Sequence, residues 1–219
     1  MTEAEWLACD NAVQMLAFLR ETNNLDERRN RLSGVALCRR VWHLLTDPRS
    51  RDAVEVAERW ADREATPEEL DAAFEAAFDV FAAYREQGGE VAPGWAACAA
   101  ADISHPDEAA EAVARAAAHA GGEGEATAQA GIMKCVFGNP FRRLTVDAGW
   151  LTPTVANLAP VTYEERALPS GELDPQRLAV LADALEDAGC ADPGLLGHLR
   201  SPGPHVRGCW ALDLVLGKE

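Results

Sequence analysis

Two cysteines and two histidines close to the C-terminus are the residues whose types and spacing point most directly to chemistry. They follow the spacing C-x7-H-x6-H-x3-C and are Cys190, His198, His205 and Cys209. Two thiolates and two imidazoles form a common tetrahedral zinc-binding set. His205 and Cys209 would also share one helical face if the last helix reached back to residue 205. One hypothesis is therefore a metal-binding protein or metalloenzyme that holds zinc or iron at these four residues.

A second interpretation of the same residues needs no metal. The spacing lacks the tight C-x2-C or H-x3-H pair that makes a zinc motif specific. Cys209 precedes Trp210 in an apolar segment, where a thiol packs as a small hydrophobic side chain. His205 would then cap the start of the last helix. The spacing favours this core-and-capping interpretation, and both alternatives stay open.

One acidic residue lies inside the apolar run W-A-L-D-L-V-L of residues 210–216. A carboxylate in such a helix needs a partner, because burying an unpaired charge is costly. Arg207 and Arg200 are the candidate partners of Asp213 on the preceding segment. We predict a buried ion pair between Asp213 and Arg207 that holds the C-terminal helix in place.

Recognisable catalytic signatures are missing from the sequence. It contains no G-x-S-x-G turn, no G-x-x-x-x-G-K-[ST] phosphate loop and no H-E-x-x-H zinc helix. We therefore predict no catalytic residue, and the chain is more readily explained as a protein that is not an enzyme. On this leading hypothesis it has no cofactor, and zinc enters only with the alternative.

The charge balance sets the kind of partner that we expect. Lys and Arg number 20 against 36 Asp and Glu, which gives a formal net charge of −16. Such a charge repels nucleic-acid phosphates and anionic membrane surfaces. The arginines of residues 28–31 and 39–40 are predicted to form the solvated face of one helix. The leading hypothesis is an acidic helical protein-protein interaction or accessory subunit, with a basic protein as its partner.

Several features favour a cytoplasmic protein. No apolar run approaches the roughly 20 residues that cross a bilayer, and the first ten residues are acidic instead of basic. The six cysteines are spread along the chain and do not form the dense framework of a small secreted domain. We expect them to stay reduced.

Helix starts are the clearest structural signal. An Asp or Thr, whose side chain can cap a helix, is followed at once by proline at five places, 47–48, 66–67, 152–153, 174–175 and 192–193. The first residue accepts a free N–H, and proline suits the first helical position. No alternating strand pattern of useful length occurs. The predicted fold is all-α, a single-domain irregular helical bundle of about eight to ten helices.

Three segments of that one compact domain are expected: N-terminal helices in 1–87, an Ala/Gly-rich variable helical insert in 88–131, and a C-terminal helical block in 132–219. The first helix is predicted to run from Thr2 to Arg20. Alanine buries little area, so helices of the insert are predicted to lie at the domain's edge.

Two further expectations concern single helices. In the helix that starts at Pro67, the predicted buried face consists of the apolar positions Leu70, Phe74, Ala77, Phe78 and Phe81. Pro160 is predicted to kink or split the helix of residues 153–166, because proline removes one backbone hydrogen bond.

Several phrases resemble an expanded paralogous family of planctomycete bacteria. They are M-T-E-A-E-W-L at 1–7, C-R-R-V-W-H-L-L at 38–45, A-V-E-V-A-E at 53–58, F-G-N-P-F at 137–141, W-L-T-P at 150–153 and G-P-H-V-R-G-C-W at 203–210. The likeness covers about the first 65 residues and the last 85. It implies a helical fold and a bacterial cytoplasm, and it carries no catalytic residue or cofactor to this chain. Pro160 departs from the family pattern.

Overall fold

The computed structural model describes residues 1–86, 106–122, 124–142 and 144–218. The fold is all-α: these residues hold eleven α-helices, two short 3-10 helices and one hairpin of two-residue strands. The chain divides into two compact units, an N-terminal unit of Met1–Met133 and a C-terminal unit of Lys134–Glu219. The second boundary of the three predicted segments, at 131–132, lies close to this division.

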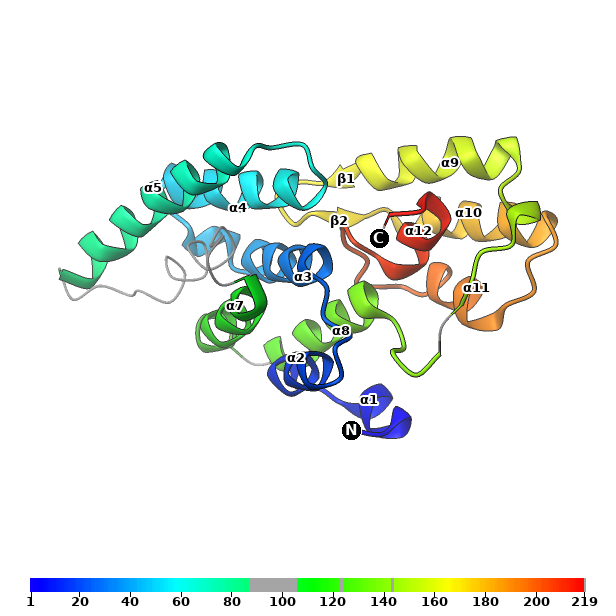
Figure 1. The fold of residues 1–219 in the computed structure, drawn as a ribbon, viewed down its shortest axis with the longest axis horizontal. Helices are drawn as coiled ribbons and strands as arrows, with labels where there is room; N and C mark the ends of the chain where they lie inside the picture. The colour runs from blue at the N-terminus through cyan, green and yellow to red at the C-terminus, as the bar shows by residue number, and fades with distance from the viewer. Residues whose placement is uncertain (87–105, 123, 143, 219) are drawn as a thin grey trace. The chain divides into compact units, whose positions relative to one another are not determined.

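The helices of the N-terminal unit are α1 (Glu3–Ala8), α2 (Ala12–Glu21), α3 (Glu27–Arg40), α4 (Pro48–Ala61), α5 (Pro67–Glu86), α7 (Pro106–Gly121) and most of α8 (Glu125–Phe137), with the 3-10 helix η1 (Trp42–Leu44). Within this unit α3 packs against α4 and α7, and α4 packs against α5 (Figure 1). The predicted single first helix is wrong. Asn11 accepts a hydrogen bond from the Gln14 N–H, so it ends the turn after α1 and starts α2.

Helix α7 corrects the prediction that helices of the insert lie at an edge. Its residues Ala110, Val113, Ala114 and Ala117 are fully buried. Gly34 of α3 faces it so closely that a Cβ there would lie 3.6 Å from the Ala110 Cα. Small side chains on both helices therefore allow a close contact, and burial comes from backbone approach as well as side-chain size. Residues 88–105 of the predicted insert lie outside the described residues.

Other expectations for the N-terminal unit also need correction. Leu70 and Ala77 of the predicted α5 face are buried, and Ala73 and Val80 complete the buried stripe. The three phenylalanines are not in this stripe and contact one another at its border. The arginines of α3 do not form a solvated face. Arg31 and Arg39 are buried, and Arg39 donates to Glu58 at 2.8 Å.

The C-terminal unit contains the 3-10 helix η2 (Ala148–Trp150), α9 (Pro153–Glu164), β1 (Arg166–Ala167), β2 (Glu172–Leu173), α10 (Pro175–Asp187), α11 (Pro193–Leu199) and α12 (Trp210–Leu216). Within it α10 packs on α9 and α11, and α12 packs on α9 and α11 (Figure 1). The strands are antiparallel, with Arg166 opposite Leu173 and Ala167 opposite Glu172. The loop after α11 adds one bridge, between Val206 and Glu172.

The predicted capping residues are confirmed as helix starts. Asp47, Thr152, Asp174 and Asp192 each accept a backbone N–H at the start of the following helix. Thr66 and Glu69 form a reciprocal capping box at α5. Pro160 does not split α9, which continues to Glu164. Pro160 and Ala156 both face solvent, so water can satisfy the carbonyl that the proline leaves free.

Among the described residues, no helix is both long enough and apolar enough to cross a bilayer.

Candidate metal centre

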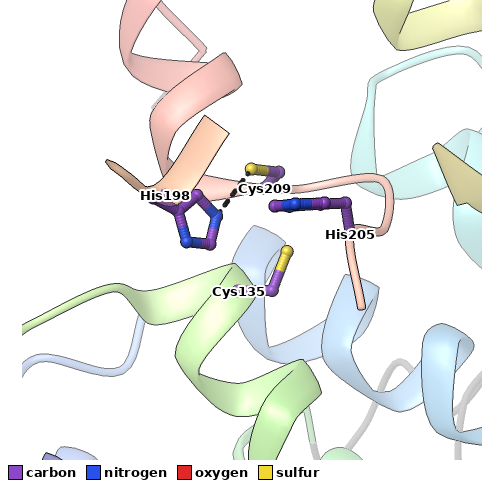
Figure 2. A group of neighbouring side chains, drawn as sticks. All are labelled: Cys135, His198, His205 and Cys209. Carbon is purple, nitrogen blue, oxygen red and sulfur yellow. Dashed lines mark hydrogen bonds between the residues drawn. The ribbon is translucent and has the colours of Figure 1, made fainter. Parts of the chain in front are cut away.

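Four side chains of the C-terminal unit converge on one point, Cys135, His198, His205 and Cys209 (Figure 2). We call this group the Cys/His site. One ligand atom from each residue lies within 4.8 Å of the other three. The residues come from the end of α8, the end of α11, the loop after α11 and the residue before α12. No two of them share a helix.

The structure brings together three of the four residues that the sequence singled out. Cys190 is not among the four, and Cys135 contributes the second sulfur in its place. Cys190 instead follows α10, where its N–H donates to the Leu185 carbonyl and its side chain lines a surface hollow with Pro193 and Arg200. Sequence spacing missed Cys135 because it lies between buried Met133 and Val136 in a pattern typical of a core helix.

The end of α8 is fixed against the start of α12, which positions Cys135. Gly138 follows the helix with a φ of +62°, a left-handed conformation that suits glycine. A Cβ on Gly138 would lie 2.9 Å from the Cγ of Trp210. The indole of Trp210 also contacts the ring of His198, with 5.3 Å between centroids. Trp210 therefore packs on two of the segments that carry the Cys/His site.

Cys209 lies directly before α12 as its N-cap, without a capping bond from its side chain. The last helix thus begins at Trp210, and the expectation that His205 and Cys209 share its face is wrong. The Cys209 N–H donates to the Val206 carbonyl at 2.9 Å, so a tight turn presents the sulfur. That sulfur lies 3.2 Å from Nε2 of His198.

The ring of His205 is held from the other side by the end of α11. Its Nε2 lies 3.0 Å from the Ser201 carbonyl oxygen and 3.3 Å from the Ser201 hydroxyl. Its Nδ1 is buried and has no hydrogen-bond partner. The ring meets that of His198 edge-on, at 4.9 Å between centroids. His205 therefore does not cap α12 as the second interpretation expected.

In the metal-free protein the surroundings of the site favour the thiolate form of Cys209 and the thiol form of Cys135. Cys135, Cys209 and His205 are at most 2% exposed, whereas His198 is half-buried. Burial and the neighbouring Cys209 sulfur raise the pKa of the Cys135 thiol well above its ordinary value. Burial opposes ionisation of Cys209 too, but the neighbouring Cys135 thiol and the two histidine rings hold its pKa well below the ordinary value. Burial lowers the pKa of His205, yet the Cys209 sulfur and the Ser201 carbonyl outweigh it and raise the pKa overall.

The donor set matches a tetrahedral metal ion. With Zn–S bonds of about 2.3 Å and Zn–N bonds of about 2.0 Å, tetrahedral angles put neighbouring ligand atoms roughly 3.3 to 3.8 Å apart. The 3.2 Å between Cys209 Sγ and His198 Nε2, and the 4.8 Å limit on all other pairs, lie close to this range. Small side-chain rotations would therefore complete a four-ligand shell.

The predicted ion pair of the last helix joins two residues of the C-terminal unit. Asp213 and Arg207 are both buried. The Arg207 guanidinium donates to the Glu164 carboxylate at 3.0 and 3.2 Å and lies over the Tyr163 ring, 4.9 Å from its centroid. The Asp213 N–H donates to the Cys209 carbonyl at 2.8 Å. Pairing between the Asp213 and Arg207 side chains stays a prediction.

Neither a protein-family model, nor a curated protein, nor a solved structure matches this chain. The site is therefore interpreted from its own geometry, and the resemblance to the planctomycete family stays a prediction.

Proposed function

We propose that the protein binds one zinc ion at the Cys/His site and that the ion stabilises the C-terminal unit. The observation that carries this proposal is the convergence of two thiols and two imidazoles from separate segments, within 4.8 Å, at a buried point. Four protein ligands fill a tetrahedral shell, which is typical of structural zinc, whereas catalytic zinc keeps a position for water. The proposed ion would join the end of α8 to the segment that carries α11 and α12.

The core-and-capping interpretation explains less of the geometry. Buried cysteines are common in cores, so either thiol alone would need no further explanation. A buried imidazole nitrogen without a hydrogen bond is different, because an unsatisfied buried polar atom costs about 1 to 3 kcal/mol. Nδ1 of His205 is such an atom. A metal ion at the site removes this cost and neutralises two thiolates.

Sulfur and nitrogen ligands in equal number favour zinc, with iron as the next candidate. Elemental analysis by inductively coupled plasma mass spectrometry of the purified protein tests the proposal. We expect about one zinc per chain, and cobalt substitution should give the visible spectrum of a tetrahedral ion. A protein that is purified without metal and fails to take up zinc or iron on titration would disprove the proposal.

A pair of cysteine variants makes the test specific to the residues. Cys135→Ser should lose the metal, because it removes a ligand. Cys190→Ser serves as the matched control, since Cys190 is equally buried but lies outside the four converging side chains. It should keep about one zinc per chain. Metal loss in the Cys190 variant with retention in the Cys135 variant would favour the set predicted from spacing.

The charge of the chain supports a second proposal, which is compatible with structural zinc. An excess of 16 negative charges favours association with a basic protein and raises the rate of such encounters. We propose that the zinc-stabilised helices serve as an accessory or interaction subunit without catalysis of its own. Affinity capture at low and moderate salt should recover a specific basic partner, and recovery of none would count against this second proposal.

A further inference from the structure

The hydrogen bonding of His205 indicates which of its nitrogens binds the ion. We propose that His205 binds the metal through Nδ1 and that Ser201 is the positioning residue that fixes this choice. The inference rests on the proposed zinc function and deepens it. Its evidence is the arrangement of Ser201 on one side of the ring and the unpartnered Nδ1 on the other.

The Ser201 carbonyl decides where the ring proton lies. A carbonyl oxygen only accepts hydrogen bonds, so the 3.0 Å contact requires that Nε2 of His205 carries a hydrogen and donates it. In a neutral imidazole the other nitrogen then holds a lone pair. That nitrogen is the buried Nδ1, which has no hydrogen-bond partner. This is the usual state of a metal-binding histidine, whose second ring nitrogen donates to a carbonyl or carboxylate.

The Ser201 hydroxyl links the two histidines. Its Oγ donates to the His198 carbonyl at 2.7 Å, which uses its only hydrogen. The oxygen also lies 3.3 Å from Nε2 of His205, where it can only accept. Ser201 therefore ties the orientation of the His205 ring to the last turn of α11, which carries His198. His198 itself directs Nε2 at the Cys209 sulfur, so the two histidines use different ring nitrogens.

Nitrogen-15 labelling of histidine in the full chain tests the inference. Long-range proton-nitrogen correlation spectra identify which ring nitrogen is protonated and which one shifts on metal binding. In the metal-free protein we expect His205 to carry its hydrogen on Nε2. On addition of zinc, the coordination shift should appear at Nδ1 of His205 and at Nε2 of His198.

The spectra separate failure of the inference from failure of the proposed function. Zinc bound with the coordination shift at Nε2 of His205 would overturn this inference and leave the zinc site intact. A neutral His205 ring whose only hydrogen is on Nδ1 in the metal-free protein would also overturn it. If no zinc binds, the proposed function and the inference fail together.

A serine variant tests the positioning role separately. Ser201→Ala keeps the carbonyl and removes the hydroxyl, and we expect zinc affinity to fall by about tenfold, at the lower end of such outer-shell effects. Ser170→Ala is the matched control, because the Ser170 hydroxyl likewise donates to a carbonyl three residues earlier, that of Ala167, at 3.1 Å. The control should bind zinc as the unmodified protein does.

Affinity is measured by competition with a chelator of known strength, on variants whose circular dichroism matches the unmodified protein. Ser201→Thr retains a hydroxyl and should recover most of the affinity, which a general loss of packing would not allow. Equal affinities of Ser201→Ala, Ser170→Ala and the unmodified protein would overturn the role of the Ser201 hydroxyl. A threonine variant as weak as the alanine variant would do the same.

Discussion

Gly138 and Trp210 touch where the end of α8 meets the start of α12, so closely that a Cβ on the glycine would lie 2.9 Å from the indole Cγ. The contact holds the helix end that carries Cys135 against the tryptophan that follows Cys209. A methyl group at this position would have to displace the indole, the helix end or both. Packing at this contact is therefore coupled to the geometry of the Cys/His site.

Gly138→Ala should destabilise the C-terminal unit more than Gly217→Ala. Both glycines end a helix with nearly equal φ values of +62° and +65°. Each alanine therefore bears about the same left-handed penalty, roughly 1 to 2 kcal/mol. Nothing lies within 4 Å of a Cβ at Gly217, so only Gly138→Ala adds an overpacking cost of about 1 to 3 kcal/mol. Urea denaturation measures the difference, and equal losses would contradict the packing argument.

Gly203→Ala should weaken zinc binding, whereas Gly189→Ala should not. Both glycines have a φ of +94°. A Cβ at Gly203 would lie 2.8 Å from the backbone nitrogen of His205, so the ligand must move, whereas a Cβ at Gly189 meets nothing within 4 Å. We expect the zinc dissociation constant of the first variant to rise by about an order of magnitude.

Competition with a chelator gives the zinc dissociation constants of the Gly203→Ala and Gly189→Ala variants. Denaturation of the metal-free variants gives the loss of stability that each suffers from placing alanine at a positive φ. If the two variants bind zinc equally well, the loop around Gly203 does not position His205.

Acidification should release the metal. In the metal-free protein the pKa of His205 is raised, mainly because the Cys209 sulfur and the Ser201 carbonyl outweigh burial. Stability from this group is fully present below the unfolded-state pKa and is lost as the pH rises through the raised folded-state pKa. Zinc reverses the dependence, because a coordinated nitrogen cannot hold the proton.

The stabilisation that zinc confers should therefore shrink as the pH falls from 8 towards 6. The melting temperature is measured with and without saturating zinc at each pH in this range. The difference between the two melting temperatures gives the stabilisation by zinc. A difference that stays constant or grows on acidification would argue against histidine coordination.

Removing one partner of the Arg39–Glu58 pair should destabilise the N-terminal unit strongly. The two side chains are 3% and 4% exposed and lie 2.8 Å apart. Glu58→Gln leaves a buried guanidinium with a neutral neighbour and should cost about 3 kcal/mol. The double variant Arg39→Met/Glu58→Leu should recover most of that loss of stability, because it removes both buried charges of the pair.

Arg115→Gln provides the surface comparison. Arg115 is 65% exposed and pairs with Glu111 on the same helix, so its loss should cost less than about 0.5 kcal/mol. Similar losses for the buried and the exposed pair would show that burial of Arg39 and Glu58 does not set their contribution.

Local chemistry explains which parts of the fold were predictable. Thr152 and Asp174 define helix starts through hydrogen bonds to N–H groups within three residues, so their effect is visible in sequence. Cys135 joins His198 only through the tertiary fold, across 62 intervening residues. Arg39 looked solvated because its partner Glu58 lies on another helix, and a helical pattern does not show which charges are paired across helices.

The contact of Gly34 with Ala110 shows what the alanine-rich composition does in the fold: its small side chains allow α7 to approach α3 closely. A Cβ on Gly34 would already be at van der Waals distance from α7, and the α7 alanines of this face are fully buried, so a larger side chain in place of one of these alanines would have to displace its neighbours. The buried face of this alanine-rich helix is therefore sensitive to enlargement of its side chains. Variation in the helix should be confined to positions that face solvent, such as Arg115.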